Sequence, residues 1–193
     1  MADSILALNG VHTAGKSSLG EMLEEREGLN YFPEVAQKLI DEEGADWGEE
    51  GDHAFQSAIH EEEASRDRDI LDGDLDHAVV ETWHFGNLAH SMETAREGLV
   101  RDQNEYIQVV SEETDTDIYA VFFNMPLENI WNRSPHFEEG DDEILDFYDR
   151  VRDNHFQIYS EHGIEHVVIE NDEKGLEEAY SQVRDFAYEV LEQ

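Results

Sequence analysis

The chain has 193 residues, of which 39% are hydrophobic and 10% aromatic, enough for one domain with a substantial core and too apolar for a disordered protein. Its 49 acidic residues outnumber its 12 basic ones, which gives a formal net charge of −37. Because nucleic acids and anionic membranes carry the same sign of charge, neither is an expected partner. The absence of cysteine excludes disulfides and thiolate metal sites.

The acidic residues are spread along the whole chain, and only three lysines remain, namely Lys16, Lys38 and Lys174. A fold that repels itself this strongly is compact only if its charges are solvated and screened, which predicts a halophilic protein from a cell interior with molar salt. The alternative is an acidic protein of an ordinary cell. The N-terminal apolar run is too short for a signal peptide or a membrane span, so a cytoplasmic location is expected.

Short apolar runs alternate with longer stretches of helical periodicity. Residues 4–8, SILAL, are apolar after Ser4, which predicts a buried strand, and an amphipathic helix is expected directly after it. The further predicted strands are residues 29–32, 77–83, 117–125 and 164–170. The further predicted helices are residues 33–43, about 50–72, 84–113, a stretch from 144 onward, and 176–192.

Strands that are apolar nearly throughout, each followed by a helix, indicate an α/β fold in which helices cover both faces of a parallel sheet. Neither an internal repeat nor a linker rich in Pro, Gly or Ser divides the sequence, so residues 1–193 are expected to form a single domain. The polar stretch 132–143 contains both glycine and proline and is short enough for a mobile surface segment.

Residues 10–17, GVHTAGKS, match the pattern G-x-x-x-x-G-K-S between the first predicted strand and the first predicted helix. In such a loop, glycines such as Gly10 and Gly15 adopt unusual backbone angles, and backbone N–H groups point at phosphate oxygens. Lys16 would reach the β- and γ-phosphates of ATP, and the Ser17 hydroxyl would ligate Mg²⁺. A chance match is expected in about one chain in a thousand, so ATP and Mg²⁺ are the predicted cofactors. The predicted nucleotide-binding residues are Gly10, Val11, His12, Thr13, Ala14, Gly15, Lys16, Ser17 and Ser18.

Residues 79–91, VVETWHFGNLAHS, resemble the thymidylate kinase group of P-loop kinases, which has Asp-Arg-Tyr here and Leu-Ala-Tyr shortly after. Glu81, Thr82 and Trp83 occupy the first three places, so Thr82 replaces the family arginine. Glu81 falls at the carboxyl edge of the sheet, where ligands bind in such folds, and is a predicted metal ligand, directly or through water, and a predicted substrate residue. Trp83 is a candidate substrate residue that could stack on a base, although aromatic residues near a sheet edge are more often part of the core.

Residues 31–44, YFPEVAQKLIDEEG, resemble small ATPase/kinase domains like those that phosphorylate nicotinamide riboside. Glu34 matches the glutamate of that group, whereas Gln37 stands in the place of an arginine. In deoxynucleoside kinases a glutamate at this strand edge takes the proton of a sugar hydroxyl, so the resemblance implies that Glu34 is a catalytic base or a ligand of a sugar hydroxyl. The alternative is an ordinary solvated carboxylate at a helix start.

Residues 124–156 resemble the fourth strand, helix and lid of nucleoside monophosphate kinases. Arg133, Asp141, Asp142 and Arg150 match the family layout of an arginine before the lid, an acidic pair and a further arginine. Arg133 and Arg150 are therefore candidate catalytic residues, because guanidinium groups stabilise the charge that spreads over the γ-phosphoryl oxygens. The alternative for each arginine is a surface ion pair. The predicted lid covers about residues 133–143.

Together these resemblances imply a P-loop kinase with five parallel strands in the order 2-3-1-4-5. The predicted reaction is transfer of the γ-phosphoryl group of ATP to a nucleoside, a nucleotide or a nucleoside-like small molecule. The alternatives are an ATPase that drives a partner and a nucleotide-sensing protein without transfer activity, the latter favoured by Thr82 and Gln37. The sequence leaves open the identity of the acceptor and the oligomeric state, a homodimer included.

Overall fold

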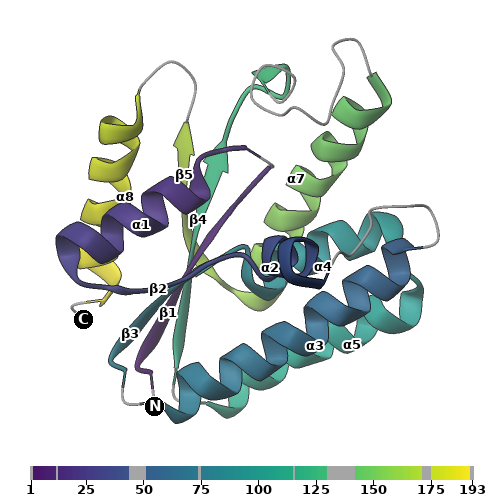
Figure 1. Cartoon of the computed structure of the whole chain (residues 1–193), viewed down its shortest axis with the longest axis horizontal. Coiled ribbons are helices and arrows are strands. Elements are labelled where there is room, and N and C mark those ends of the chain that lie inside the picture. Colours follow the sequence, from purple (N-terminus) through teal and green to yellow (C-terminus); the bar gives the residue numbers. More distant parts are fainter. Residues whose placement is uncertain are drawn as a thin grey trace.

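The structure is a computed structural model that describes residues 2–11, 13–43, 51–73, 75–114, 116–129, 142–170 and 175–191. At its centre is one five-stranded parallel sheet in the order β2-β3-β1-β4-β5 (Figure 1). The strands are β1 Ser4–Gly10, β2 Asn30–Phe32, β3 His77–Glu81, β4 Asp117–Asn124 and β5 Glu165–Glu170. This architecture confirms the predicted fold class and strand order.

Helices cover both faces of the sheet. They are α1 Lys16–Glu27, α2 Val35–Glu43, α3 Gly51–Asp72, α4 Trp83–Thr94, α5 Glu97–Glu113, α7 Asp142–His162 and α8 Leu176–Leu191. Figure 1 shows α1 and α8 together on one side of the sheet, and α3, α4, α5 and α7 on the other. The helices thus form the outer layers of a three-layer sandwich.

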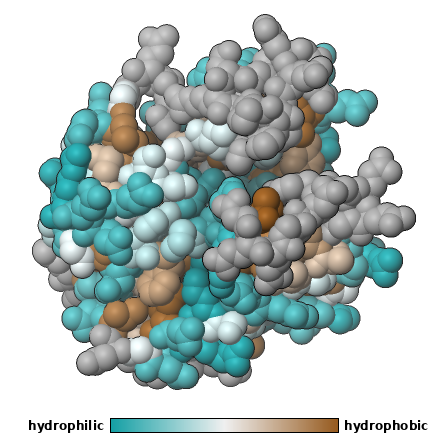
Figure 2. Space-filling model, viewed as in Figure 1, coloured by the Kyte–Doolittle hydropathy of each residue, from teal (hydrophilic) through white to brown (hydrophobic). Residues whose placement is uncertain are grey.

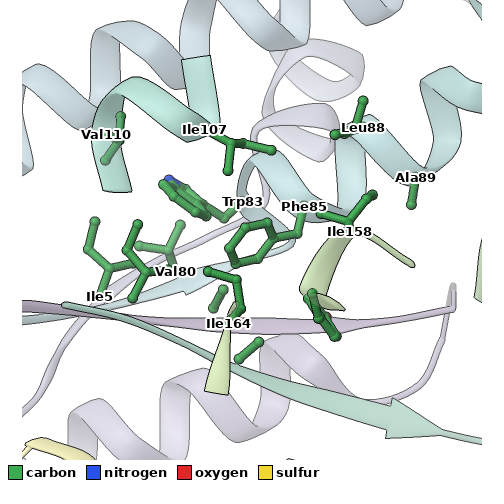
Figure 3. Packing of buried hydrophobic residues seen from close by; sticks show 14 of the residues in the cluster. Ile5, Val80, Trp83, Phe85, Leu88, Ala89, Ile107, Val110, Ile158 and Ile164 are labelled. Atoms are coloured by element: carbon green, nitrogen blue, oxygen red, sulfur yellow. The ribbon is translucent and has the colours of Figure 1, made fainter. Parts of the chain in front are cut away.

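Alternating side chains of β1 supply two separate cores, which is why this strand is apolar nearly throughout. Ile5 and Ala7 belong to a cluster with buried residues of α4, α5 and α7, whereas Leu6 and Leu8 belong to a cluster with α1 and α8. The first cluster includes the indole of Trp83 at the start of α4 (Figure 3). Burial on both faces holds β1, and with it the loop that follows β1, in a fixed position.

The structure corrects two predicted element bounds and the predicted burial of one residue. The third strand ends at Glu81 rather than at residue 83, because a tight turn begins there. The predicted helix over 84–113 is two helices, α4 and α5, since Ala95 and Arg96 between them have extended backbone conformations. Leu176 was expected on the buried face of the last helix, but it is 42% exposed.

The described part of the face in Figure 2 is mainly hydrophilic, with separate apolar patches. This agrees with an acidic chain whose charges are solvated. Among the described residues, no helix combines the length and the apolar character that a membrane span requires.

Candidate active site

The loop between β1 and α1 has the backbone geometry of a phosphate-binding loop. Gly10 has φ +141°, and an added Cβ would lie 2.7 Å from the carbonyl oxygen of Phe123, so glycine is required there. Gly15 has φ +91° and precedes the first turn of α1. That turn has neither an acidic residue nor a side-chain cap. Its N–H groups and the helix dipole therefore favour an anion at this position.

Lys16 is folded over this loop. The residue is only 6% exposed, and its ammonium group donates hydrogen bonds to the carbonyl oxygens of Gly10 at 3.3 Å and Val11 at 3.4 Å. The charge is thus held where a bound phosphate would lie, next to the N–H groups of the loop.

Ser17 and Glu81, which the sequence analysis paired as metal ligands, are in direct contact. The Ser17 hydroxyl donates to Glu81 Oε1 at 2.9 Å, and the Tyr31 hydroxyl donates to Glu81 Oε2 at 2.5 Å. Glu81 is 2% exposed, and burial is the main cause that raises its pKa, with a smaller contribution from the charge of Glu34 and an opposing one from Lys16. Tyr31 was not predicted as a residue of this site.

The oxygen atoms of Ser17 and Glu81 fit Mg²⁺, which prefers hard oxygen ligands and usually binds through one or two protein groups and substrate phosphates. Among the described residues, no group of three or more His, Asp or Glu side chains is arranged to hold a metal ion alone. A metal at this position would therefore depend on the nucleotide for its remaining ligands.

A pocket next to the loop brings the P-loop and Glu34 together. The pocket opens to solvent, and the space within it that a water-sized molecule can reach is about 50 Å³. Its lining comes from four separate parts of the chain, namely the P-loop, the start of α2, the turn into α4, and α7. The lining residues are Gly10, Lys16, Glu34, Ala36, Gln37, Ile40, Thr82, Gly86, His90 and Tyr148. The pocket thus includes Thr82 and Gln37, the two positions where the resemblance implies arginine.

Glu34 lies in the loop between β2 and α2, and α3 holds this loop in place. Arg66 Nη1 donates to the carbonyl oxygen of Pro33 at 3.1 Å, and Arg66 Nη2 bonds Glu63 Oε1 at 3.0 Å. Glu34 also contributes to the raised pKa of Tyr148, of which burial is the larger cause. Glu34 lines the same pocket as Lys16 and Tyr148.

The prediction that Trp83 stacks on a substrate base is wrong. Thr82 and Trp83 have φ +66° and +37°, and this turn places the indole in the core, where it is 0% exposed (Figure 3). Its Nε1–H donates to both carboxylate oxygens of Asp67, at 3.0 and 3.2 Å. Trp83 is thus a structural residue that fixes the start of α4 against α3.

The structure does not bring Arg150 into the pocket. Tyr148 lines the pocket, and a residue two positions further on a helix is rotated by about 200°. Arg150 accordingly lies on the other side of α7, where its Nε is 2.6 Å from Glu93 Oε2 and its side chain is 56% exposed. This is the surface ion pair that the sequence analysis gave as the alternative.

Several predicted positions lie outside the described residues. They are His12 of the loop, Arg133, Asp141 and the lid up to residue 141. Asp142 begins α7.

Seven of the ten lining residues, His90 and Tyr148 among them, were not predicted as site residues. His90 is four positions after Gly86, so both lie on the same face of α4. The spacing from Thr82 could have identified this face, but only the contact between α4 and α7 brings Tyr148 to it.

The comparisons with known proteins agree with this geometry at the level of the fold. Neither a scan against protein-family models nor a search of curated proteins finds a match. Solved structures do match. A NadR protein in complex with NR has a TM-score of 0.75 at 11% identity over 99% of this chain, which spans about half, 52%, of the NadR chain.

Two further structures match over nearly their whole length. A deoxyadenosine kinase from M. mycoides has a TM-score of 0.63 at 12% identity, over 96% of this chain and 99% of its own. A thymidylate kinase from Candida albicans has a TM-score of 0.62 at 13% identity, over 97% of this chain and 92% of its own. Identities this low show the fold alone. The chain has the fold of small-molecule P-loop kinases, and its particular reaction has to be inferred from the pocket.

Proposed function

We propose that the chain is an ATP- and Mg²⁺-dependent kinase that transfers the γ-phosphoryl group to a nucleoside, a nucleotide or a nucleoside-like small molecule. The observation that carries this proposal is one pocket whose lining includes both Lys16 of the P-loop and Glu34. A pure nucleotide-binding protein has no need of a carboxylate that faces the position of the transferred group.

In the proposed reaction, loop N–H groups and Lys16 hold the β- and γ-phosphates of ATP. An acceptor hydroxyl in the pocket attacks the γ-phosphorus, the bond from phosphorus to the β,γ-bridging oxygen breaks, and ADP leaves. Glu34 takes the proton of the hydroxyl. If the acceptor is a phosphate, no strong base is needed and Glu34 positions it. Mg²⁺, held by Ser17 and Glu81, would neutralise charge on the phosphates.

The test is a transfer assay with Mg-ATP against nucleosides, nucleoside monophosphates and nicotinamide riboside. Molar KCl is required because a net charge of −37 destabilises the fold when unscreened. Lys16→Ala should abolish both the ATP-induced rise in melting temperature and the transfer. Glu34→Gln should lower kcat about 10²–10⁴-fold without reducing the ATP-induced rise.

Glu97→Gln is a matched control, because Glu97 is also an acidic residue at a helix start but is exposed and outside the pocket. It should leave transfer unchanged. Equal activity of Glu34→Gln and the unmodified protein would contradict the role of Glu34 as a base.

The second candidate is an ATP-binding protein without transfer activity. It is favoured by one observation: Lys16 is the only Lys or Arg among the described lining residues, and Thr82 and Gln37 stand where arginines are implied. This candidate predicts ATP binding with no acceptor-dependent ADP formation. An ATPase instead predicts ADP formation at the same rate with and without acceptors.

A further inference from the structure

His90 lines the same pocket as Glu34, and the backbone fixes which of its ring nitrogens carries a proton. Its Nδ1 lies 2.9 Å from the carbonyl oxygen of Gly86, one turn earlier on α4. A carbonyl oxygen only accepts hydrogen bonds, so Nδ1 must be the donor. In a neutral imidazole, Nε2 then has a free lone pair and is a hydrogen-bond acceptor.

The surroundings of His90 keep its ring neutral. Burial is the main cause that lowers its pKa, and the positive charge of Lys16 lowers it further, while the Gly86 carbonyl and Glu34 oppose them. The ring also packs against α7, with its centroid 6.2 Å from that of Tyr148 and 6.0 Å from that of Phe147. Since Nδ1 bonds its own helix, Nε2 is the polar atom that the ring can offer to a bound molecule.

The charges around the pocket limit which kind of molecule can bind beside His90. Glu34 lines the pocket and Glu81 lies behind Ser17, whereas Lys16 is committed to the P-loop. A phosphate group beside Glu34 would be repelled by the negative charge of Glu34. Among the described lining residues, no Lys or Arg other than Lys16 is present to offset this repulsion. Hydroxyl and N–H groups of a bound molecule could instead donate hydrogen bonds to two acceptors, the carboxylate of Glu34 and Nε2 of His90.

We propose that His90 is a specificity-determining residue, whose Nε2 accepts a hydrogen bond from a second hydroxyl or N–H group of an unphosphorylated, polyhydroxylated acceptor such as a nucleoside. This inference rests on the proposed kinase function and narrows its substrate class. His90 orients the acceptor, while Glu34 takes the proton from the hydroxyl that attacks. The pocket then selects a nucleoside over its own monophosphate.

The test uses adenosine, cytidine and uridine, each compared with its 5′-monophosphate and with its 2′-deoxy and 3′-deoxy forms. Binding is measured by calorimetry and transfer by ADP release, in molar KCl. We expect kcat/KM for a nucleoside to exceed that for its monophosphate. His90→Phe should raise KM about 10–100-fold with a small change in kcat, as expected for one lost hydrogen bond. His90→Gln, which retains an acceptor, should restore part of the affinity.

One deoxy form lacks the hydroxyl that bonds His90. Its affinity for the unmodified protein should be as low as the affinity of the parent nucleoside for His90→Phe. The His90→Phe substitution should not lower the affinity for this deoxy form any further. His166→Phe is the control, because His166 is exposed on β5 and outside the pocket. Preference for monophosphates, or equal KM in the unmodified protein and His90→Phe, would overturn the inference while leaving the kinase function intact. If nucleosides bind in a way that depends on His90 but no transfer occurs, the kinase function alone is overturned. If no nucleoside binds and no transfer occurs, both the inference and the kinase function are overturned.

Discussion

Asp67 on α3 holds the start of α4 through buried hydrogen bonds, and its substitution should show how much this network stabilises the fold. Besides the two bonds from Trp83, His84 Nε2 lies 2.9 Å from Asp67 Oδ2, and the side chains of both residues are 0% exposed. Burial, the largest single influence, acts to raise the pKa of Asp67. His84, Arg66 and the Trp83 N–H together outweigh burial, so the pKa is lowered and the carboxylate stays charged.

Asp67→Asn keeps the size of this side chain but removes its charge and one acceptor oxygen. Hydrogen bonds to charged groups contribute about 1.5–3 kcal/mol each. Asn offers one acceptor oxygen in place of two, so at least one of these bonds is lost, and we expect the free energy of unfolding to fall by about 1.5–3 kcal/mol. Asp69→Asn, the same substitution at an exposed position of α3, should change it by less than about 0.5 kcal/mol.

Urea unfolding followed by circular dichroism in molar KCl measures both variants. High salt screens exposed charge pairs and leaves buried ones nearly unaffected, so it separates the network from general charge repulsion. A loss of less than about 1 kcal/mol for Asp67→Asn, or equal losses for Asp67→Asn and Asp69→Asn, would refute the assigned role of the buried network.

Three other substitutions test the site and the fold. Arg66→Ala removes the hydrogen-bond donor that holds the loop of Glu34. The kcat of transfer should therefore fall about 10–100-fold, while the ATP-induced rise in melting temperature stays the same. An unchanged kcat would contradict this positioning role. Gly10→Ala introduces a Cβ 2.7 Å from a carbonyl oxygen of β4 and should abolish the ATP-induced shift in a thermal melt; a normal shift would show that the loop tolerates a side chain. Burial lowers the pKa of His155 from its ordinary 6.5 to about 3, so the folded state binds the proton more weakly than the unfolded state. Stability should therefore decrease as the pH falls from about 6.5 towards 3. Because His90 also has a lowered pKa and contributes to the same slope, His155→Phe should reduce the slope, by up to about 1.4 kcal/mol per pH unit, in urea titrations at several pH values; an unchanged slope would argue against this.

The sequence predicted the parts of the site that depend on local spacing. Gly10, Lys16 and Ser17 are close in sequence, and their loop needs only a buried strand before it and a helix after it. Glu81 could be predicted because the last residue of a buried parallel strand lies at the carboxyl edge of the sheet. The strand order, by contrast, came from the resemblance and not from the residues themselves.

The wrong prediction for Trp83 has a physical cause. Its position after an apolar strand is equally consistent with a base-stacking residue and a core residue, and only the partner of its indole N–H separates the two. That partner is Asp67, which lies 16 positions earlier on α3. Nothing in the sequence marks Asp67, among 49 acidic residues, as one that is buried. Arg150 is different, since helical periodicity alone places it on the side of α7 away from Tyr148.

Charge divides the pocket into two halves, and this division gives Glu34→Gln a distinctive signature. In the proposed reaction, Lys16 and the loop around Gly10 would attract the phosphates of ATP, whereas Glu34 would repel the γ-phosphoryl group as it approaches the acceptor. A Glu34 that takes the proton of the acceptor hydroxyl would become neutral in the same step, so the repulsion would end as the phosphoryl group arrives. Glu34→Gln removes the repulsion permanently and the base with it. In a kinase this variant should therefore bind ATP at least as tightly as the unmodified protein while transferring slowly, whereas in a protein that only binds ATP the affinity would rise with no transfer rate to lose.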